Sequence, residues 1–378
     1  MKVLHAGPFK LGTACGHFNA LWGLAKAQAV RGDDVTIVRV GKDVANSDLK
    51  VACDNGVRLV GYPCRRWHGC WKDDTHRFER ILDEQKPDLV HLFYVRVPKF
   101  AHLSRLLRQR RVPYVVSLHG GMNSTEMRRR RVRKLVYWHA LERRVHEHAA
   151  GLHFVSAGEL LDYRATLGGW TQAEAVIPNP AELPANGVSW QGVDCPSAPR
   201  LAFLGRYDIW TKGLDLALAM LRALRAHGVD PELHLFGNAG GFAPAVHRLL
   251  AAYPDVRVTD HGYVGSPEKF EQVAKHDLYL QYSRFESFGM SLVEAMALGM
   301  PSLVSERSAL APTLSTAGAA VQIPMDPVAA AAVVAEALRR PKLLGEIGQR
   351  GRSWVRAECS PTVVAERMNG FYEELLDA

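Results

Sequence analysis

Short apolar segments alternate with longer helical ones along this chain, and no other feature of the sequence constrains the fold as strongly. In the first half, strand-like segments occur at 3–6, 34–40, 59–62, 89–93, 114–118 and 151–155, with helical stretches such as 18–30 between them. Alternation of this kind is typical of a parallel sheet that helices cover on both faces. The sequence therefore predicts an α/β fold.

The alternation is interrupted once and then resumes. Residues 176–200 are rich in proline, glycine and asparagine and show little periodicity, which indicates a linker. A second series follows, with strands expected at 201–204, 233–236, 256–258, 278–282 and 302–304, and closing helices at 327–339, 342–358 and 362–376. We predict two doubly wound Rossmann-like domains, residues 1–185 and 186–361, with a C-terminal helix in 362–378 that packs back on the first domain. Ligands of such sheets bind at the carboxyl ends of the strands, so we expect a cleft between the domains.

Composition and cysteine usage favour a cytoplasmic globular protein. The chain is 47% hydrophobic and 23% charged, as in ordinary globular proteins. The first residues, MKVLHAGPF, resemble a strand rather than a signal peptide, and the longest uncharged run, 308–325, is interrupted by proline and glycine. The six cysteines show no C-x-x-C pair and no cluster with zinc spacing, so we expect free thiols in a reducing compartment.

Two segments of the first half combine a strand end with glycine. The loop 10–18 contains Gly12 and Gly16, which allow the backbone to approach a ligand, and the helix that follows offers free N–H groups to an anion. The pattern is not the dinucleotide-binding G-x-G-x-x-G, and a tight turn without a ligand is the alternative. His119 ends a strand and precedes Gly120 and Gly121, so a functional and a structural role are both open for it.

A pair of cations follows the first strand of the second half. Arg206 comes directly after Gly205, and Lys212 precedes Gly213 at the start of a helix. Two cations at a strand end, beside a helix N-terminus, can clamp a phosphate. The alternative is solvated surface charge, but glycine beside each cation favours binding, because surface charge alone does not need a close backbone approach.

Two carboxylates flank the start of a later apolar helix. Glu286 precedes the helix and Glu294 lies inside it, eight positions on, which is roughly 12 Å if the segment is fully helical. Carboxylates accept hydrogen bonds from vicinal hydroxyls, so one could hold a sugar and the other a ribose. The neighbours of Glu294 are apolar, and a buried carboxylate without a partner is costly. We therefore expect a hydroxylated ligand to be its partner, the alternative being a solvent-facing residue.

Several segments together resemble one known family. FESFGMSLVEAMALGMP, which contains Glu286 and Glu294, resembles the signature of retaining family 4 glycosyltransferases of the GT-B fold. GRYDIWTKGLD resembles the family's GR…KG element, VIPNP its interdomain segment, and LHLFGNAGG its strand before the nucleobase pocket. VVSLHG and HFVSAGE resemble strands of its N-terminal domain. The similarity covers almost the whole chain, in the same order of elements.

The resemblance implies a donor site in the C-terminal half. Arg206 and Lys212 would hold the diphosphate of a nucleotide sugar and stabilise the departing nucleotide, and Glu294 would hold the ribose hydroxyls. The residues that would grip the transferred sugar are Glu286 and, through their backbone N–H groups, Phe288, Gly289 and Met290. The nucleobase would lie near Gly237, Tyr263 and Val264.

The N-terminal half would receive the acceptor. His119 matches the family's histidine near the anomeric centre, and Gly12 and Gly16 match the loop that faces the donor phosphates and the acceptor. The resemblance implies a hexosyltransferase that uses a UDP- or GDP-linked sugar. Its acceptor would be a hydroxyl of a saccharide or of a lipid-diphosphate-linked glycan, in the biosynthesis of a bacterial-type surface polysaccharide such as lipopolysaccharide.

The expected reaction needs neither a protein nucleophile nor a metal. Retention in such enzymes is ascribed to attack on the face of the leaving group, with a donor phosphate oxygen as base. The chain also lacks an Asp-x-Asp pair, which usually binds a catalytic divalent ion in the other large transferase fold. We expect no cofactor, with Arg206 and Lys212 supplying the positive charge that a metal would supply.

The densest basic cluster lies in the first half and consists of Arg128, Arg129, Arg130, Arg131, Arg133 and Lys134. Apolar residues of the segment 127–148, among them Val132, Val136 and Val145, fall on a rough helical stripe. One interpretation is a helix packed by this stripe, with solvated charge outside. The other is a peripheral membrane surface, where the cations meet anionic lipid and Tyr137 and Trp138 lie at the interface. That surface would suit a lipid-linked acceptor at the inner face of the cytoplasmic membrane.

Two other functions remain as alternatives. The basic segment with its aromatic residues could belong to a non-catalytic nucleic-acid-binding protein. We do not expect a nucleic-acid partner, because the charge is confined to one region and carboxylates such as Glu286 and Glu294 would repel phosphates. A sugar-nucleotide epimerase or hydrolase of the same fold is the second alternative, which product analysis with and without acceptor would distinguish.

Overall fold

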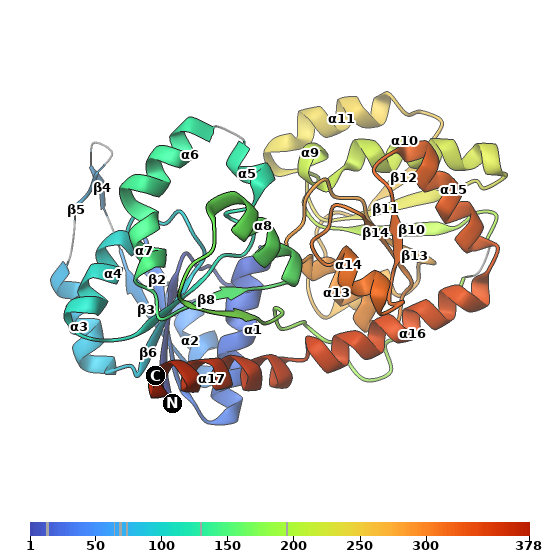
Figure 1. Ribbon diagram of the computed structural model, residues 1–378. Coiled ribbons are helices and arrows are strands. Elements are labelled where there is room, and N and C mark those ends of the chain that lie inside the picture. Colours follow the sequence, from blue (N-terminus) through green and yellow to red (C-terminus); the bar gives the residue numbers. More distant parts are fainter. Residues whose placement is uncertain (13–14, 64, 68–69, 73–74, 129–130, 194–195) are drawn as a thin grey trace. The chain divides into compact units, whose positions relative to one another are not determined.

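The computed structural model in Figure 1 describes residues 1–378 except 13–14, 64, 68–69, 73–74, 129–130 and 194–195. The chain forms two compact units. Unit 1 contains Met1–Pro180 and Pro361–Ala378, and unit 2 contains Ala181–Ser360. The sequence had placed these boundaries at 185 and 361. The structure places the first of them within the proline-rich segment, immediately after Pro180.

Unit 1 contains a parallel sheet of seven strands in the order β3-β2-β1-β6-β7-β8-β9. The strands are β1 (Lys2–Gly7), β2 (Asp34–Val40), β3 (Val57–Tyr62), β6 (Leu89–Phe93), β7 (Tyr114–Ser117), β8 (Gly151–Phe154) and β9 (Ala173–Val176). Five of the six residues of β1 and all five of β6 are buried. Helices covering both faces account for this burial, as in other parallel sheets. The α/β prediction is confirmed for this half, although the sequence did not predict β9.

The helices of unit 1 connect successive strands. They are α1 (Gly16–Arg31), α2 (Asn46–Asp54), α3 (Thr75–Gln85), α4 (Phe100–Gln109), α5 (Ser124–Arg128), α6 (Arg131–Tyr137), α7 (Arg143–Glu147) and α8 (Ala157–Leu167). A π-helical turn, η1 (Trp138–Glu142), joins α6 to α7, and a small antiparallel hairpin, β4 (Arg65–Trp67) with β5 (Cys70–Lys72), precedes α3.

The C-terminal helix α17 (Pro361–Asp377) belongs to unit 1 and packs beside α1 (Figure 1). Asn369 accepts a hydrogen bond from Gln28 Nε2 at 2.7 Å and donates to Asp33 at 2.6 Å. The hydroxyl of Tyr372 contacts His91 Nδ1 on β6. These contacts are buried or partly buried, so the end of the chain is anchored to the unit that contains its beginning.

Unit 2 contains a parallel sheet of six strands in the order β12-β11-β10-β13-β14-β15. The strands are β10 (Arg200–Leu204), β11 (Glu232–Phe236), β12 (Arg257–Asp260), β13 (Leu278–Gln281), β14 (Ser302–Ser305) and β15 (Val321–Ile323). The sequence did not predict β15. This order is doubly wound: the chain proceeds from β10 toward one edge and, after β12, returns to add β13 on the other side. Ligands of such sheets bind outside the carboxyl ends of the two strands that flank the reversal, here β10 and β13.

The helices of unit 2 are α9 (Ile209–Lys212), α10 (Leu214–Leu224), α11 (Ala243–Ala251), α12 (Glu268–Val273), α13 (Met290–Ala297), α14 (Ala311–Thr316), α15 (Pro327–Leu338) and α16 (Pro341–Glu358), with short 3₁₀ turns at Arg225–His227 and Gly240–Phe242. Helices α10 and α15 pack against each other over the sheet. None of the described helices has the length and apolar character needed to cross a bilayer.

Candidate functional site

Glycines bring the carboxyl ends of the strands in unit 2 close together. Gly237, after β11, has φ +154°, and a Cβ there would lie 1.9 Å from the carbonyl oxygen of Gly205, after β10. Gly213 has φ +66°, and its Cβ would lie 2.1 Å from the carbonyl oxygen of Tyr282, after β13. No other residue type fits either position without moving the backbone. The glycine beside Lys212 is thus required by the contact of this loop with β13.

Lys212 and Glu286 form an ion pair at this end of the sheet. Lys212 ends α9 and Glu286 follows β13, and their side chains are 20% and 17% exposed. Arg206, which follows β10, is exposed to solvent and, within the described part of the chain, makes no hydrogen bond or ion pair. The structure therefore brings Lys212 and Glu286 together and leaves the guanidinium of Arg206 accessible to an anion.

Arg284 fixes the loop that carries Lys212. Its guanidinium binds Asp215 of α10 through two hydrogen bonds of 2.8 and 2.6 Å. It also donates to the carbonyl oxygens of Ile209 and Trp210, at 3.3 and 3.1 Å. This forked geometry is one that arginine provides and lysine does not. No role for Arg284 was predicted from the sequence, although Asp215 is a charged residue in the apolar first part of α10 and could have indicated a partner.

The N-terminus of α13 faces buried polar groups. Gly289 precedes the helix with φ +87°, and a Cβ there would lie 2.4 Å from Nε2 of Gln281. The amide of Gln281 and the hydroxyls of Ser283 and Ser308 are buried, and no described residue hydrogen-bonds to them. Ser308 pairs with Glu286 through the backbone. Buried polar groups without partners cost about 1–3 kcal/mol each, so this end of the sheet is suited to a polar ligand.

Glu294 differs from its prediction. It is 6% exposed, as the apolar surroundings suggested, but its partner is a side chain: Lys269 Nζ on α12 lies 3.0 Å away. Lys269 also binds Glu182 at 2.8 Å. The sequence predicted a hydroxylated ligand as the partner of Glu294, and the structure adds a protein partner, Lys269, that was not expected. No signal in the sequence linked the two residues, because Lys269 lies in a polar helix that precedes β13.

The charges of this pair depend on each other. Burial raises the pKa of the Glu294 carboxyl, and the nearby Lys269 opposes that rise. Burial also opposes the charge of Lys269, but Glu294 and Glu182 outweigh it and hold the pKa of Lys269 above its usual value. The second carboxylate oxygen of Glu294 remains able to accept hydrogen bonds from a ligand.

The predicted nucleobase loop, which includes Tyr263 and Val264, follows β12. Asp260 accepts hydrogen bonds from Tyr207 Oη at 2.5 Å and from the N–H of Gly262 at 2.8 Å. The carbonyl of Gly262 in turn accepts from the N–H of Gly237 at 2.7 Å. The loop is thereby attached to the ends of β10 and β11, while the Tyr263 side chain is exposed.

In unit 1, His119 follows β7 in a strained conformation. Its φ is +46°, which is uncommon for a residue other than glycine and occurs mainly where surrounding structure enforces it. The ring stacks on Phe93 with centroids 5.2 Å apart. Burial holds the pKa of His119 well below its usual value, so the ring is neutral, and its buried Nε2 has no hydrogen-bond partner among the described residues.

Glu159 holds the loop of His119. Its carboxylate accepts hydrogen bonds from the N–H groups of Gly120, directly after His119, and of Val155 at 2.7 Å. Burial raises the pKa of Glu159 to about 7, although the two backbone hydrogen bonds oppose this rise. Sequence reasoning missed Glu159, which lies within HFVSAGE and is the third residue of α8, the helix capped by Ser156.

The glycine-containing loop of unit 1 begins α1. Gly12 has φ +66°, and Gly16 is the first residue of the helix. Cys15, at the N-cap position, provides no side-chain cap, but its Sγ lies 3.2 Å from Nδ1 of His17. The Cys15 carbonyl accepts hydrogen bonds from the N–H groups of Phe18 and Asn19 at 3.0 Å, so it satisfies two of the first amides of α1.

The basic segment differs from the interpretation in which its apolar stripe packs inward, because only part of the stripe is buried. Arg128 ends α5, and Arg131, Arg133 and Lys134 lie on α6, whereas Arg129 and Arg130 lie outside the described residues. Val132 and Val136, expected to pack inward, are 76% and 63% exposed, and Val145 is buried.

The membrane hypothesis also placed Trp138 incorrectly. Trp138, expected at a lipid interface, is 4% exposed and packs edge-on against His146 and Trp170, with centroids 5.0 and 6.0 Å away. Tyr137 is half-buried. The π-helical turn at Trp138–Glu142 interrupts the helical register, which is why the stripe does not continue across it.

Comparison with known sequences identifies two parts of one enzyme family. Residues 16–180 match the family described as "Glycosyl transferase 4-like domain", and residues 198–340 match "Glycosyl transferases group 1". A glycogen synthase of Alkalilimnicola ehrlichii is 31% identical over 178 residues, which cover 47% of this chain and 35% of that protein. A phosphatidyl-myo-inositol mannosyltransferase of Mycobacterium leprae is 30% identical over 195 residues, covering 46% and 48%. The chain thus spans less than half the length of these curated relatives.

The structural comparison agrees with the sequence comparison. Anabaena HepE, solved in complex with UDP-glucose, superposes with a TM-score of 0.76 at 15% identity, over 99% of this chain and 100% of that chain. Identity this low shows the fold alone, here two Rossmann-like domains. With both halves of the chain matched in the same order, the protein belongs to family 4 of the glycosyltransferases, with the GT-B fold.

Proposed function

We propose that this chain is a retaining glycosyltransferase that moves a hexosyl group from a nucleoside diphosphate sugar to a hydroxyl of a saccharide or lipid-linked glycan. The Lys212–Glu286 ion pair carries the proposal. It places one cation and one carboxylate at the carboxyl ends of the strands that flank the reversal, where a ligand with an anionic and a hydroxylated end can engage both.

The two cations would act on the diphosphate. Cleavage of the sugar–phosphate bond leaves negative charge on the departing nucleotide, and Lys212 with the accessible guanidinium of Arg206 would stabilise that charge. The N–H groups at the start of α13 would add to this field, since the helix begins after Gly289 without a side-chain cap. Preorganised charge of this kind reduces the barrier without a protein nucleophile or a metal.

The two carboxylates would hold the hydroxylated ends of the donor. Glu286 would exchange its contact with Lys212 for hydroxyls of the transferred sugar, while Lys212 turns to the phosphates. Glu294, charged and oriented by Lys269, would accept hydrogen bonds from the ribose hydroxyls. The loop containing Gly237, Tyr263 and Val264 would contact the nucleobase. A UDP- or GDP-linked donor fits this arrangement, and HepE, the structural relative, is known in complex with UDP-glucose.

Residues of unit 1 would serve the acceptor. His119 is neutral, and its buried Nε2 has no partner among the described residues, so it is able to contact a substrate hydroxyl. We propose retention by attack on the face of the leaving group, with a donor phosphate oxygen accepting the proton of the acceptor hydroxyl. Under this mechanism His119 contacts the reacting sugar without becoming covalently attached to it.

The acceptor would be presented at an anionic membrane surface, during synthesis of a surface polysaccharide. Helix α6 exposes Arg131 and Arg133 beside Val132 and Val136, one turn apart, which together offer positive charge and apolar surface. The exposed valines replace the aromatic residues as the side chains that would enter the interface. Sedimentation with vesicles tests this part: binding should be stronger to anionic than to neutral vesicles at low salt, and equal binding to both would contradict it.

The proposed function is tested with a panel of UDP- and GDP-sugars. The correct donor should raise the melting temperature of the wild-type chain, because a ligand at 100 times its Kd stabilises by about 2.7 kcal/mol. The Lys212→Ala variant should melt normally without ligand, lose the donor-induced shift, and transfer sugar at least about 100-fold more slowly, as for loss of other charge-stabilising groups. Stabilisation by an oligonucleotide but by no nucleotide sugar would refute the proposal. A single product formed equally with and without acceptor would instead indicate an epimerase or hydrolase.

A further inference from the structure

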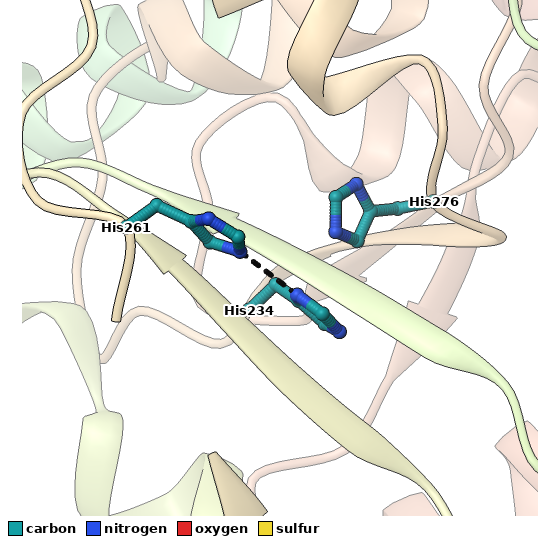
Figure 2. A group of neighbouring side chains, drawn as sticks. All are labelled: His234, His261 and His276. Atoms are coloured by element: carbon teal, nitrogen blue, oxygen red, sulfur yellow. Dashed lines mark hydrogen bonds between the residues drawn. The ribbon is translucent and has the colours of Figure 1, made fainter. Parts of the chain in front are cut away.

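Three histidines from separate elements meet on unit 2, and none of them is among the residues proposed to bind the donor. His234 lies on β11, His261 directly follows β12, and His276 lies between α12 and β13. Figure 2 shows the three rings directed toward one another. Each offers a ring nitrogen, and the three nitrogens lie within 4.8 Å of one another. Within the described ranges of the chain, this is the one group of three or more His, Cys, Asp or Glu with such spacing.

The rings are already arranged with nitrogens facing inward. His234 Nδ1 and His261 Nε2 are 2.9 Å apart, the contact drawn as a dashed line in Figure 2. Because both nitrogens share one proton in this contact, at least one of them presents a lone pair. The ring of His276 meets that of His234 edge-on, with centroids 4.3 Å apart.

Acceptors on the outer side orient one of the rings, and a carboxylate lies beside another. His276 Nδ1 lies 3.1 Å from the carbonyl oxygen of Gln272 and 3.3 Å from that of Val273, so it carries the proton and leaves the lone pair on Nε2. His234 Nε2 is buried without a hydrogen-bond partner among the described residues, and Oε1 of Glu232, which is itself held by the Thr259 hydroxyl at 2.7 Å, lies 3.4 Å from it. Metal-ligating histidines commonly donate their second N–H to a carbonyl, as His276 does, or to a carboxylate, which Glu232 places beside His234.

Nearby positive charge is partly neutralised. Arg200, on the adjacent β10, interacts electrostatically with His234, but its guanidinium lies 3.6 Å from the buried carboxylate of Asp277. Glu232 adds a second carboxylate beside the cluster. The cluster is thus surrounded by charges of both signs, and a divalent cation is not opposed by an uncompensated arginine.

We propose that His234, His261 and His276 bind one divalent transition-metal ion of the Zn²⁺ class. Three imidazoles suit zinc, copper or nickel and do not suit Mg²⁺ or Ca²⁺, which prefer oxygen. Zinc–nitrogen bonds of about 2.1 Å in a tetrahedral site separate the nitrogens by about 3.4 Å, so the hydrogen-bonded pair would need to widen by only about 0.5 Å. His261 is exposed, so the ion can enter from solvent and keep water as a fourth ligand.

The ion would act on the loop after β12. His261 lies next to Gly262, whose carbonyl accepts from Gly237, and both lie in the region proposed to contact the nucleobase. A metal ion bound to His261 would therefore fix the position of this loop. This consequence depends on the proposed function, whereas binding of the ion does not.

The test measures Zn²⁺ binding to the chelator-treated full chain by competition with a chromogenic chelator. We compare the wild type with His261→Ala, Glu232→Gln and the control His247→Ala, which removes an exposed histidine of α11 in the same unit. The exposed position of His261 makes its substitution compatible with folding, which a melting curve verifies. The assay measures metal binding and no enzymatic activity. A chain that binds no Zn²⁺ would therefore contradict the metal site alone, and a negative donor screen would contradict the proposed function alone.

We expect one Zn²⁺ per chain at this site in the wild type and in His247→Ala. Zn²⁺ binding should weaken at least about 100-fold in His261→Ala. It should weaken about 10–100-fold in Glu232→Gln, which is the range known for substitution of residues that orient metal ligands. Co²⁺ in place of Zn²⁺ should give the visible absorption of a tetrahedral site, lost in His261→Ala. Equal stoichiometry and affinity in the wild type and His261→Ala would overturn the proposal.

Discussion

Replacement of Lys269 by methionine should destabilise unit 2, because it leaves the buried Glu294 carboxylate without its cation. Methionine keeps an unbranched side chain close in length to the aliphatic part of lysine and removes the ammonium group. Both partners are well shielded, with side chains 12% and 8% exposed, so solvent screens their contact weakly. Removing one partner of a buried ion pair costs about 3–5 kcal/mol. We expect a loss in this range at pH 7, because the contact of Lys269 with Glu182, which is 48% exposed, adds little.

The loss should depend on pH in a defined direction. Burial already raises the pKa of Glu294 above its usual 4.5, and without Lys269 it should rise further. The folded variant then binds a proton that the unfolded chain has released, so its stability falls as pH rises above about 4.5 and recovers as pH falls toward that value. The raised pKa of Lys269 also contributes to the stability of the wild type. This contribution is fully present at all pH values below the usual 10.5 of lysine, so it does not vary between pH 5 and pH 7.

Urea unfolding of the intact chain at pH 7 and pH 5 provides the measurement. Lys275→Met removes an exposed lysine two residues beyond the end of α12 and serves as the control for loss of one positive charge. The double variant Lys269→Met/Glu294→Leu should regain most of the stability, since replacing a buried pair by apolar residues is often neutral. A loss below about 1 kcal/mol at pH 7, typical of an exposed pair, or the same loss at both pH values would refute the reasoning.

Three further predictions concern the two units separately. Glu286→Gln should free Lys212, so that a nucleoside diphosphate without sugar binds more tightly in calorimetry while sugar transfer slows; weaker binding of the diphosphate would contradict the competition between Glu286 and phosphate. The Glu159 carboxyl should titrate near pH 7 by NMR, with a signal that Glu159→Gln removes; a midpoint near 4.5 would show that it is not desolvated. Val136→Asp should reduce binding to anionic vesicles at least about tenfold, whereas Val333→Asp, on the exposed part of α15, should not; equal binding by both variants would exclude α6 as the membrane surface.

The strands were predictable because their apolar residues form continuous runs. LVHLF and LYLQY are recognisable as buried strands without any tertiary information. The edge strands β9 and β15 were missed because AEAV and VQI are short and only partly buried, so no apolar run distinguishes them from loops. Burial of the central strands thus determines how much of each sheet the sequence reveals.

Partnerships between distant residues were less predictable than the elements. Glu294 was identified as a buried carboxylate from its apolar neighbours, but Lys269 lies on another helix, and only packing brings the two together. The same holds for Arg284 with Asp215 and for the three histidines around His234. Helical periodicity also failed at Trp138, because a π-turn changes which residues share a face.

The pairing of Lys212 with Glu286 bears on how the site distinguishes substrate from product. Two opposite charges in contact largely cancel, so the site attracts a free phosphate less strongly than isolated cations would. In the proposed function, a nucleotide sugar would compensate for separating them, because its phosphates would engage Lys212 and its sugar hydroxyls would engage Glu286. The nucleoside diphosphate product would offer only the phosphates and would leave Glu286 competing for Lys212. The ion pair would therefore favour binding of the complete donor and promote release of the nucleoside diphosphate. Arg206 could not provide this selectivity by itself, because it is exposed and has no carboxylate partner in the described part of the chain.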